Sequence, residues 1–240
     1  MCGRYSLHNL PEVIALQFGV DALPALQPRY NIPPGTPVLA IHAGDGKARE
    51  AGMLHWGLVP SWARDRSIGN RMNNARAESA ADKPAFRAAF RRRRCILPAS
   101  GFYEWKAVDG RKQPYYIHAA NDEDLLGMAG LYEDWAGPDG VLRSCAVITT
   151  EPNAVMQAIH DRMPVILPRD AYAEWLDPDH RDATLLQRLL VPCDPAQIRA
   201  HPVSTRVSRI GHDDPQLMGP VELSPPAAPA SVAPPQGSLF

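Results

Sequence analysis

The sequence lacks several features that would assign it to a familiar class. Only four of its 240 residues are cysteines, at positions 2, 95, 145 and 193, and no two are spaced as a CxxC zinc or redox motif. No apolar run approaches the roughly 20 residues that cross a bilayer, and no signal-peptide-like apolar segment stands near the start. We therefore expect no metal, other cofactor, disulfide or membrane attachment, and a cytoplasmic protein with reduced thiols.

Charge is nearly balanced overall but unevenly distributed along the chain. The 25 basic and 26 acidic residues give a net charge of −1. Residues 1–120 contain 17 basic and 9 acidic residues, and residues 121–240 contain 8 and 17, so the two halves carry +8 and −9. This asymmetry predicts one face that attracts a polyanion.

Short apolar segments alternate with brief helical patterns. The 25 prolines are about twice the usual share of about 5% and favour short helices. The expected strands cover residues 37–41, 53–58, 94–98, 102–107, 114–118, 125–132, 144–150 and 163–167. The expected helices cover residues 10–18 (with Asn9 as the N-cap), 83–93, 171–176 and 183–190. These elements predict an α+β fold with a single compact domain over residues 1–222. Residues 223–240 contain five prolines and no charge, which predicts a disordered tail.

Cys2 follows the initiator methionine and is a candidate nucleophile. Removal of Met1 would leave a 1,2-aminothiol, with an α-amine of reference pKa about 7.7 to 8.0 beside a thiol of about 8.5. An aldehyde can condense with the amine to an imine, and the thiol can then close a thiazolidine ring on the same carbon. The alternative is a buried cysteine with only a structural role.

Glu104 and His160 are the candidates for proton transfer. Glu104 lies in the segment Gly101-Phe102-Tyr103-Glu104-Trp105, where strand alternation puts it on the same face as Phe102. An interior position would raise the proton affinity of this carboxylate and suit a general acid or base. His160 lies in a predicted loop. The alternatives to a role in proton transfer are that Glu104 is only a salt-bridged carboxylate on a strand and that His160 is only a surface or structural histidine.

Residues 61–94 form a basic region that carries ten Lys or Arg and three Asp or Glu residues, a net charge of +7. Trp56 and Trp62 lie in or beside this region, so aromatic rings accompany the cations. Single-stranded nucleic acid is bound by this combination of stacking and phosphate attraction. The run from Arg91 to Arg94 fits either such a contact or a solvated helix end, and the tryptophans fit a core equally well.

Several motifs in order resemble one known family. They are Cys2-Gly3-Arg4-Tyr5, Arg29-Tyr30-Asn31 with Pro34-Gly35, Trp56-Gly57-Leu58-Val59-Pro60-Ser61-Trp62, Asn74-Ala75-Arg76-Ala77-Glu78, Gly101-Phe102-Tyr103-Glu104-Trp105, His160-Asp161-Arg162-Met163-Pro164 and His201-Pro202-Val203-Ser204. Over residues 2–204 the chain resembles the SOS-response-associated peptidase, or abasic site processing, family. The resemblance implies a curved, barrel-like, mainly antiparallel sheet with peripheral helices and a groove for single-stranded DNA that contains abasic sites. It implies a DNA-damage protein, and we expect a monomer.

The resemblance also implies roles for individual residues. Cys2 would capture the open-chain aldehyde of an abasic deoxyribose, and Asn74 would orient the N-terminus or the sugar. Glu104 would transfer protons, with possible lyase chemistry, and His160 would assist ring opening and imine formation. The positions expected to line the DNA path are Arg4, Asn31, Trp62, Arg76, Thr149 and Arg162. The chain departs from the family pattern at four positions. Family members commonly carry asparagines where this chain has Ser208, His212 and Asp213, and frequently a small residue where it has Pro33.

Three other functions stay open at this point. Class II glutamine amidotransferases also begin Met-Cys-Gly, but the Arg-Trp-Ala-Thr-type loop and the Asn-Gly oxyanion motif that they need are missing here. A thiol peptidase that removes its own leader, with Glu104 as base, could share the same site. A non-catalytic DNA-binding module would leave Cys2 purely structural.

Overall fold

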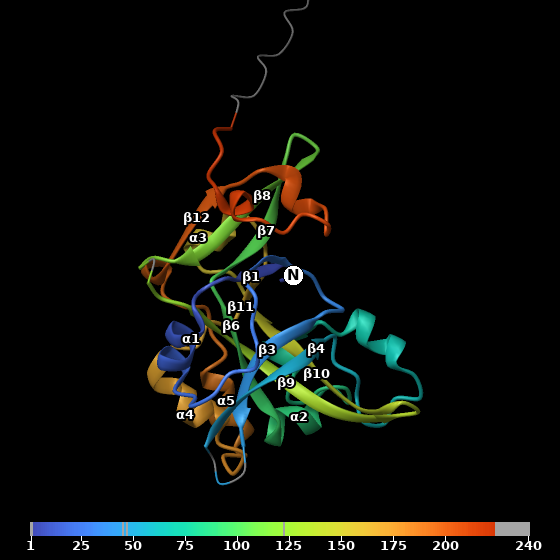
Figure 1. The fold of residues 1–240 in the computed structure, drawn as a ribbon. Coiled ribbons are helices and arrows are strands. Elements are labelled where there is room, and N and C mark those ends of the chain that lie inside the picture. Colours follow the sequence, from blue (N-terminus) through green and yellow to red (C-terminus); the bar gives the residue numbers. More distant parts are fainter. Residues whose placement is uncertain (1, 45, 47, 122, 224–240) are drawn as a thin grey trace, which may run out of the picture.

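The small sheet contains the start of the chain. The computed structural model describes residues 2–44, 46, 48–121 and 123–223, so the predicted tail lies outside the described residues except for Leu223. Five strands form this sheet in the order β12-β8-β7-β1-β2. They are β12 (Ile198–Pro202), β8 (Arg111–Ala119), β7 (Gly101–Val108), β1 (Tyr5–Leu7) and β2 (Arg29–Ile32). In Figure 1, β7, β8 and β12 lie above the second, larger sheet.

The larger sheet closes into a barrel. Its order is β11-β10-β4-β3-β6-β9, β5 pairs with β10, and β9 pairs with both β6 and β10. The strands β10, β4, β3, β6 and β9 therefore form a closed ring, which removes exposed sheet edges. The strands are β3 (Pro37–Ala43), β4 (Arg49–Trp56), β5 (Asn74–Arg76), β6 (Arg94–Ala99), β9 (Leu126–Gly137), β10 (Gly140–Thr150) and β11 (Met163–Pro164). All pairs are antiparallel except β10 with β4 and with β5, so the predicted barrel-like, mainly antiparallel sheet is confirmed.

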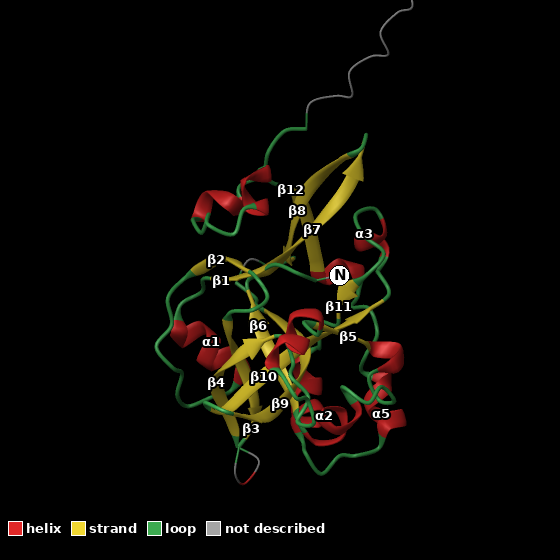
Figure 2. Ribbon diagram, turned by 90° about the vertical axis from the view of Figure 1, so that its right-hand side faces the viewer, coloured by secondary structure: helices red, strands yellow, loops and turns green. Residues whose placement is uncertain are grey.

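The helices are short and peripheral, as predicted. They are α1 (Pro11–Phe18), α2 (Arg87–Arg92), α3 (Ala154–Gln157), α4 (Tyr172–Leu176) and α5 (Ala183–Arg188). Short 3-10 helices are η2 (Arg66–Arg71), η3 (Ala77–Ser79), η4 (Arg169–Ala171), η5 (Pro195–Gln197), η6 (Thr205–Ser208) and η7 (Pro215–Met218). Figures 1 and 2 show α1, α2 and α5 around the barrel. The predicted cap of the first helix is wrong: Leu10 occupies the N-cap position, and Asn9 instead accepts a hydrogen bond from Ser100.

One continuous segment connects the two sheets and positions the predicted catalytic carboxylate. β6 passes into β7 through the single residue Ser100. Phe102 belongs to the main core, whereas Tyr103 belongs to a second cluster, packed by Trp105, on the other face of the small sheet. This confirms the predicted alternation, and it places Glu104 on the face of β7 that points towards the main core.

Arg94 corrects the interpretation of the 91–94 run as a surface feature. Its side chain is only 2% exposed. The guanidinium donates to the backbone carbonyls of Phe90, Trp175, Asp177 and His180. A fork of five N–H groups suits several carbonyls at once, so Arg94 fastens the segment after α4 to the barrel.

We predict that Arg94→Met lowers the free energy of unfolding by about 3 kcal/mol, because several buried carbonyls lose a charged donor. Urea denaturation followed by circular dichroism measures this change. Arg92→Met, at an exposed position on the last turn of α2, is the matched control and should change stability by less than about 0.5 kcal/mol. Equal effects of the two substitutions would contradict a structural role specific to Arg94.

Candidate active site

Cys2 is buried directly before β1, where neighbouring strands fix its backbone. Tyr5 pairs with Ile32 of β2 on one side and with Phe102 of β7 on the other. The Asn74 side chain donates from Nδ2 to the carbonyl oxygen of Cys2 at 2.8 Å. Cys2 itself has no exposed surface. The predicted nucleophile is therefore held rigidly although it lies near the start of the chain.

The Cys2 thiol is protonated near neutral pH. Burial, with a further contribution from the negative charge of Glu104, raises its pKa to about 12. A thiol of this kind is a poor nucleophile until a neighbouring group removes its proton. The site therefore needs a base close to the sulfur.

Glu104 is the carboxylate whose charge acts on the Cys2 thiol, and it is the residue predicted to transfer protons. It is 3% exposed, and burial raises its pKa above the ordinary glutamate value. Its Oε2 atom lies 3.8 Å from Nε2 of His160, within ion-pair distance but too long for a hydrogen bond. A buried carboxylate with raised pKa that faces a histidine is a candidate general acid or base.

The backbone selects the tautomer of His160. The Arg162 N–H donates to Nδ1 of His160 at 3.0 Å, which leaves Nε2 as the protonated nitrogen of the neutral ring, facing Glu104. A carboxylate oxygen of Asp161 also lies 2.9 Å from Nδ1, a contact that suits the imidazolium. The Asp161 side chain is 88% exposed and free to turn away, so the backbone contact determines the neutral state.

Arg4 and Asn31 form one unit with the C-terminal part of the described chain. Nη1 of Arg4 donates to Oδ1 of Asn31 at 2.7 Å and to the Val207 carbonyl at 3.0 Å. Asn31 is 2% exposed, and its Nδ2 donates to the carbonyls of Val207, Arg209 and His212. The observed contacts of Asn31 are thus with protein, and they hold this loop against Arg4. A direct contact of Asn31 with DNA stays a prediction.

Thr149 and Arg162 also lie together below the surface. Thr149 has no exposed surface, and its carbonyl accepts from Nη2 of Arg162 at 2.6 Å. The Arg162 side chain is 15% exposed and forms a two-pronged ion pair with Glu78 at 2.6 and 3.0 Å. The motif containing Glu78 was identified from the sequence, but this pairing was not, because 84 residues separate the partners and no spacing rule links them.

Among the arginines predicted to contact DNA, Arg76 is the one with an exposed side chain beside the site. β5 runs parallel to β10 in the register Val147 to Asn74 and Thr149 to Arg76. Ala75 points into the core, so Asn74 and Arg76 point the other way. Arg76 is exposed. A cation therefore lies about 7 Å along the strand from the residue that binds Cys2.

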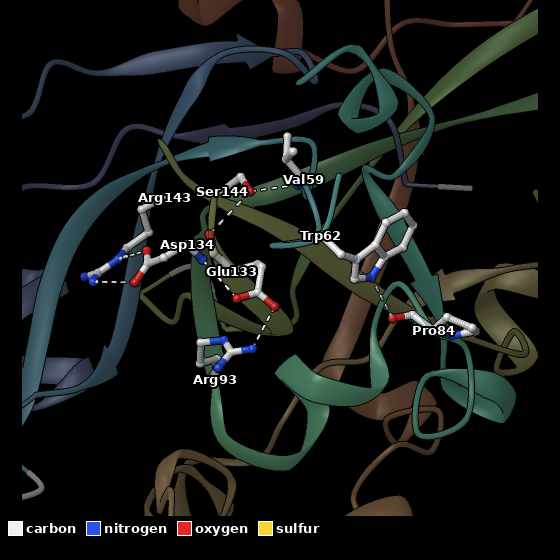
Figure 3. A network of polar contacts seen from close by, with 8 residues as sticks. All are labelled: Val59, Trp62, Pro84, Arg93, Glu133, Asp134, Arg143 and Ser144. Atoms are coloured by element: carbon white, nitrogen blue, oxygen red, sulfur yellow. Dashed lines mark hydrogen bonds and ion pairs between the residues drawn. The ribbon is translucent and has the colours of Figure 1, made fainter. Parts of the chain in front are cut away.

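Trp62 offers an exposed aromatic ring on an anchored loop. It is 59% exposed, and its Nε1 donates to the Pro84 carbonyl at 3.4 Å (Figure 3). The preceding residues are held because the Val59 N–H donates to Oγ of Ser144 at 2.8 Å, and Ser144 donates to the Glu133 carbonyl (Figure 3). Trp56, by contrast, is fully buried in the core. Of the two tryptophans, Trp62 is the one available for stacking.

Three buried polar atoms at these residues lack a hydrogen-bond partner among the described residues. They are Nε of Arg4, Oδ1 of Asn74 and Nε of Arg162. An unsatisfied buried group costs about 1–3 kcal/mol unless water or a ligand completes it. The three atoms thus identify where a polar ligand would gain hydrogen bonds.

Neither a metal site nor a spanning helix was found in the described part of the chain. No group of three or more His, Cys, Asp or Glu residues in residues 2–44, 46, 48–121 and 123–223 is arranged to hold a metal ion. None of the helices in these ranges is long and apolar enough to cross a bilayer.

Comparison with known proteins identifies the family. The profile of the SOS response associated peptidase (SRAP) family matches residues 1–210. Abasic site processing protein YoaM of Bacillus subtilis is 44% identical over 223 residues, which cover 91% of this chain and 97% of that protein. Abasic site processing protein HMCES of Xenopus tropicalis is 34% identical, over 85% of this chain and 69% of that protein. A crystal structure of a protein from Bacteroides thetaiotaomicron, 27% identical, superposes with a TM-score of 0.82 over 92% of this chain and 100% of that one. The chain belongs to the SOS response associated peptidase family, and the resemblance stated from the motifs is confirmed.

We predict that Glu104→Gln lowers the pKa of the Cys2 thiol, because the Glu104 charge adds to the effect of burial. Titration of the ¹³Cβ signals of labelled cysteine by NMR, with the Cys2 signal assigned through Cys2→Ser, measures this pKa. Glu133→Gln removes another buried carboxylate, 4% exposed, and should leave the Cys2 titration unchanged. A wild-type midpoint near the reference value of about 8.5 would contradict the described environment of the thiol.

Proposed function

We propose that the protein captures abasic sites in single-stranded DNA as a covalent adduct on Cys2. The observation that carries this proposal is the arrangement of a buried Cys2, bound by Asn74, beside a Glu104 carboxylate that faces His160. Membership of a family whose relatives YoaM and HMCES are named abasic site processing proteins supports the choice of substrate.

The proposed chemistry begins once Met1 has been removed, which frees the α-amine of Cys2. The amine attacks the aldehyde carbon of the ring-opened sugar, and loss of water gives an imine. Because the departing hydroxyl takes its proton from an acid, the imine nitrogen keeps one hydrogen of the amine, and the thiol sulfur bonds to the same carbon as its own proton passes to a base. One aldehyde and one aminothiol thus give one thiazolidine and one water.

Glu104 and His160 move the protons in this scheme. Protonated Glu104 donates to the hydroxyl that leaves as water, and the resulting carboxylate accepts the proton of the Cys2 thiol. The raised pKa of Glu104 suits this scheme, because burial favours the protonated acid that the first step needs and makes its conjugate base a stronger proton acceptor for the second. Nε2–H of His160 faces Glu104 and assists opening of the sugar ring. Asn74 orients the attacking residue through its bond to the Cys2 carbonyl.

The DNA strand is proposed to run past the cations and the exposed ring around this site. Arg76 and Arg4 supply positive charge, and the Trp62 ring supplies a stacking surface. The unsatisfied Nε–H groups of Arg4 and Arg162 add hydrogen-bond donors for phosphate or sugar oxygens, and Oδ1 of Asn74 adds an acceptor for a sugar hydroxyl. Asn31 and Thr149 contribute by holding Arg4 and Arg162 in place.

Two subsidiary reactions are proposed for the same residues. The Glu104 carboxylate would take a proton from the carbon next to the imine, a C=C bond would form, and the C–O bond to the 3′ phosphate would break, so that the strand is cleaved by β-elimination with the phosphate as leaving group. Attack of the Cys2 sulfur on the Met1 carbonyl, followed by hydrolysis of the thioester, would remove Met1 and would account for self-processing peptidase activity.

We predict that incubation with a single-stranded oligonucleotide bearing one abasic site yields a protein–DNA adduct that survives a denaturing gel. Cys2→Ala should abolish it, and Cys2→Ser should give only an imine that borohydride traps, because a hydroxyl closes the ring poorly. Cys95→Ala, Cys145→Ala and Cys193→Ala are matched controls and should retain the adduct. A stable adduct in Cys2→Ala, or none in the wild type with Met1 removed, would disprove the proposal and leave a binding module or an unrelated thiol enzyme.

We predict that Glu104→Gln slows adduct formation by about 10² to 10⁴ and that His160→Gln also slows it, since both residues act on protons. Affinity for the same strand, measured by fluorescence anisotropy, should stay within about twofold. Glu133→Gln is the control for loss of a buried carboxylate and should react at the wild-type rate. If Glu104→Gln instead binds at least tenfold more weakly yet reacts normally when saturated, Glu104 is a binding residue and not an acid or base.

A further inference from the structure

Arg162 is bound on two sides by partners of very different exposure to solvent. On one side Nη2 donates to the Thr149 carbonyl at 2.6 Å, and this backbone atom belongs to a fully buried residue of β10. On the other side Nη1 and Nη2 donate to the two carboxylate oxygens of Glu78 at 2.6 and 3.0 Å. The Glu78 side chain is 54% exposed, against 15% for Arg162. The fixed partner holds Arg162 in place, whereas the Glu78 carboxylate can move into water.

Glu78 presents the same chemistry to Arg162 as a phosphate group does. A carboxylate and a phosphate each offer two oxygens to the planar fork of an arginine. The hydrogen bond from Arg162 lowers the pKa of Glu78, so Glu78 carries its full negative charge near neutral pH. A DNA phosphate that approaches Arg162 therefore meets an anion already in its place.

The position of the pair connects this competition to the proposed site. Glu78 follows Arg76 by two residues, and Arg162 follows His160 by two residues. The backbone N–H of Arg162 is the donor that selects the tautomer of His160. In addition, Nε of Arg162 is buried and unsatisfied by the described residues, which leaves one donor for an acceptor other than Glu78.

We propose that Glu78 is a built-in competitor for the DNA backbone at Arg162. In the free protein Glu78 occupies the guanidinium, and a bound strand displaces it, so that one phosphate replaces one carboxylate. The exchange lowers affinity for any strand, and its relative effect is greatest on undamaged DNA, which forms no covalent bond to retain it. Glu78 thus favours release of undamaged strands. This inference rests on the proposed binding of single-stranded DNA.

The test measures equilibrium binding of an undamaged single-stranded oligonucleotide by fluorescence anisotropy. Glu78→Gln and Glu78→Ala should bind about twofold to fivefold more tightly than the wild type, within the range expected for a half-exposed ion pair. Asp82→Asn removes one charge from the same basic region at an exposed position and should change affinity less than twofold. A gain common to Asp82→Asn and Glu78→Gln would reflect net charge only and would overturn the proposal.

A double-mutant cycle with Arg162→Gln separates competition from other effects. Without Arg162 there is nothing for Glu78 to block, so Glu78→Gln should change affinity less than twofold in that background. A full gain in that background, or weaker binding by Glu78→Gln in the wild-type background, would show that Glu78 acts elsewhere or helps to bind DNA. Absence of binding by the wild type and all variants would instead disprove the proposed function itself.

Discussion

The candidate site depends on the way the first residues of the chain are held. Chain ends usually fray unless strand pairing or docking fixes them. Here β1 has only three residues, yet it lies between β2 and β7, and the Asn74 side chain binds the backbone just before it. Asn74 is itself placed by β10, a strand of the barrel. Both sheets therefore contribute to the position of Cys2, and this predicted nucleophile is held in place like a residue of the core.

The same burial determines the protonation states. Removing water raises the pKa of Cys2 and of Glu104 together, because both would bear negative charge when ionised. A negative charge on one group would also disfavour ionisation of the other, so a state with both groups ionised has a high free energy. Burial and the charge of Glu104 therefore act in the same direction on the Cys2 thiol and keep its proton on the sulfur. In the proposed reaction this proton has to be removed by a neighbouring group at the moment when the sulfur forms its bond.

Strong local patterns could be predicted from the sequence, and features that depend on tertiary partners could not. The apolar alternation around Phe102 and Glu104 predicted β7 and the orientation of its side chains. β1, β2, β5 and β12 were not predicted as strands, because they are short and partly polar and exist through pairing with distant strands. Asn9 has the residue type of an N-cap, but Ser100 competes for its side chain. Arg94 follows three other arginines and differs from them only because carbonyls from distant segments converge on it.

In the candidate site, too, local motifs could be predicted from the sequence and contacts between distant segments could not. The motifs brought Cys2, Asn74, Glu104 and His160 to attention, and the structure places them in one connected arrangement. The hydrogen bonds of Asn31 to the Val207 and His212 carbonyls, and the ion pair of Arg162 with Glu78, join segments 84 or more residues apart, to which no local pattern refers.

The unsatisfied polar atoms connect stability with binding. Nε of Arg4, Oδ1 of Asn74 and Nε of Arg162 are buried without partners among the described residues, a state that destabilises the free protein unless water fills it. A ligand that completes these bonds binds the folded state alone, so its binding adds to the stability of the fold by mass action. The segments around Cys2 are therefore fixed in position although some of their buried polar groups lack hydrogen bonds. The surrounding structure holds these groups in place without partners, and the fold tolerates the cost because the barrel supplies a large apolar core.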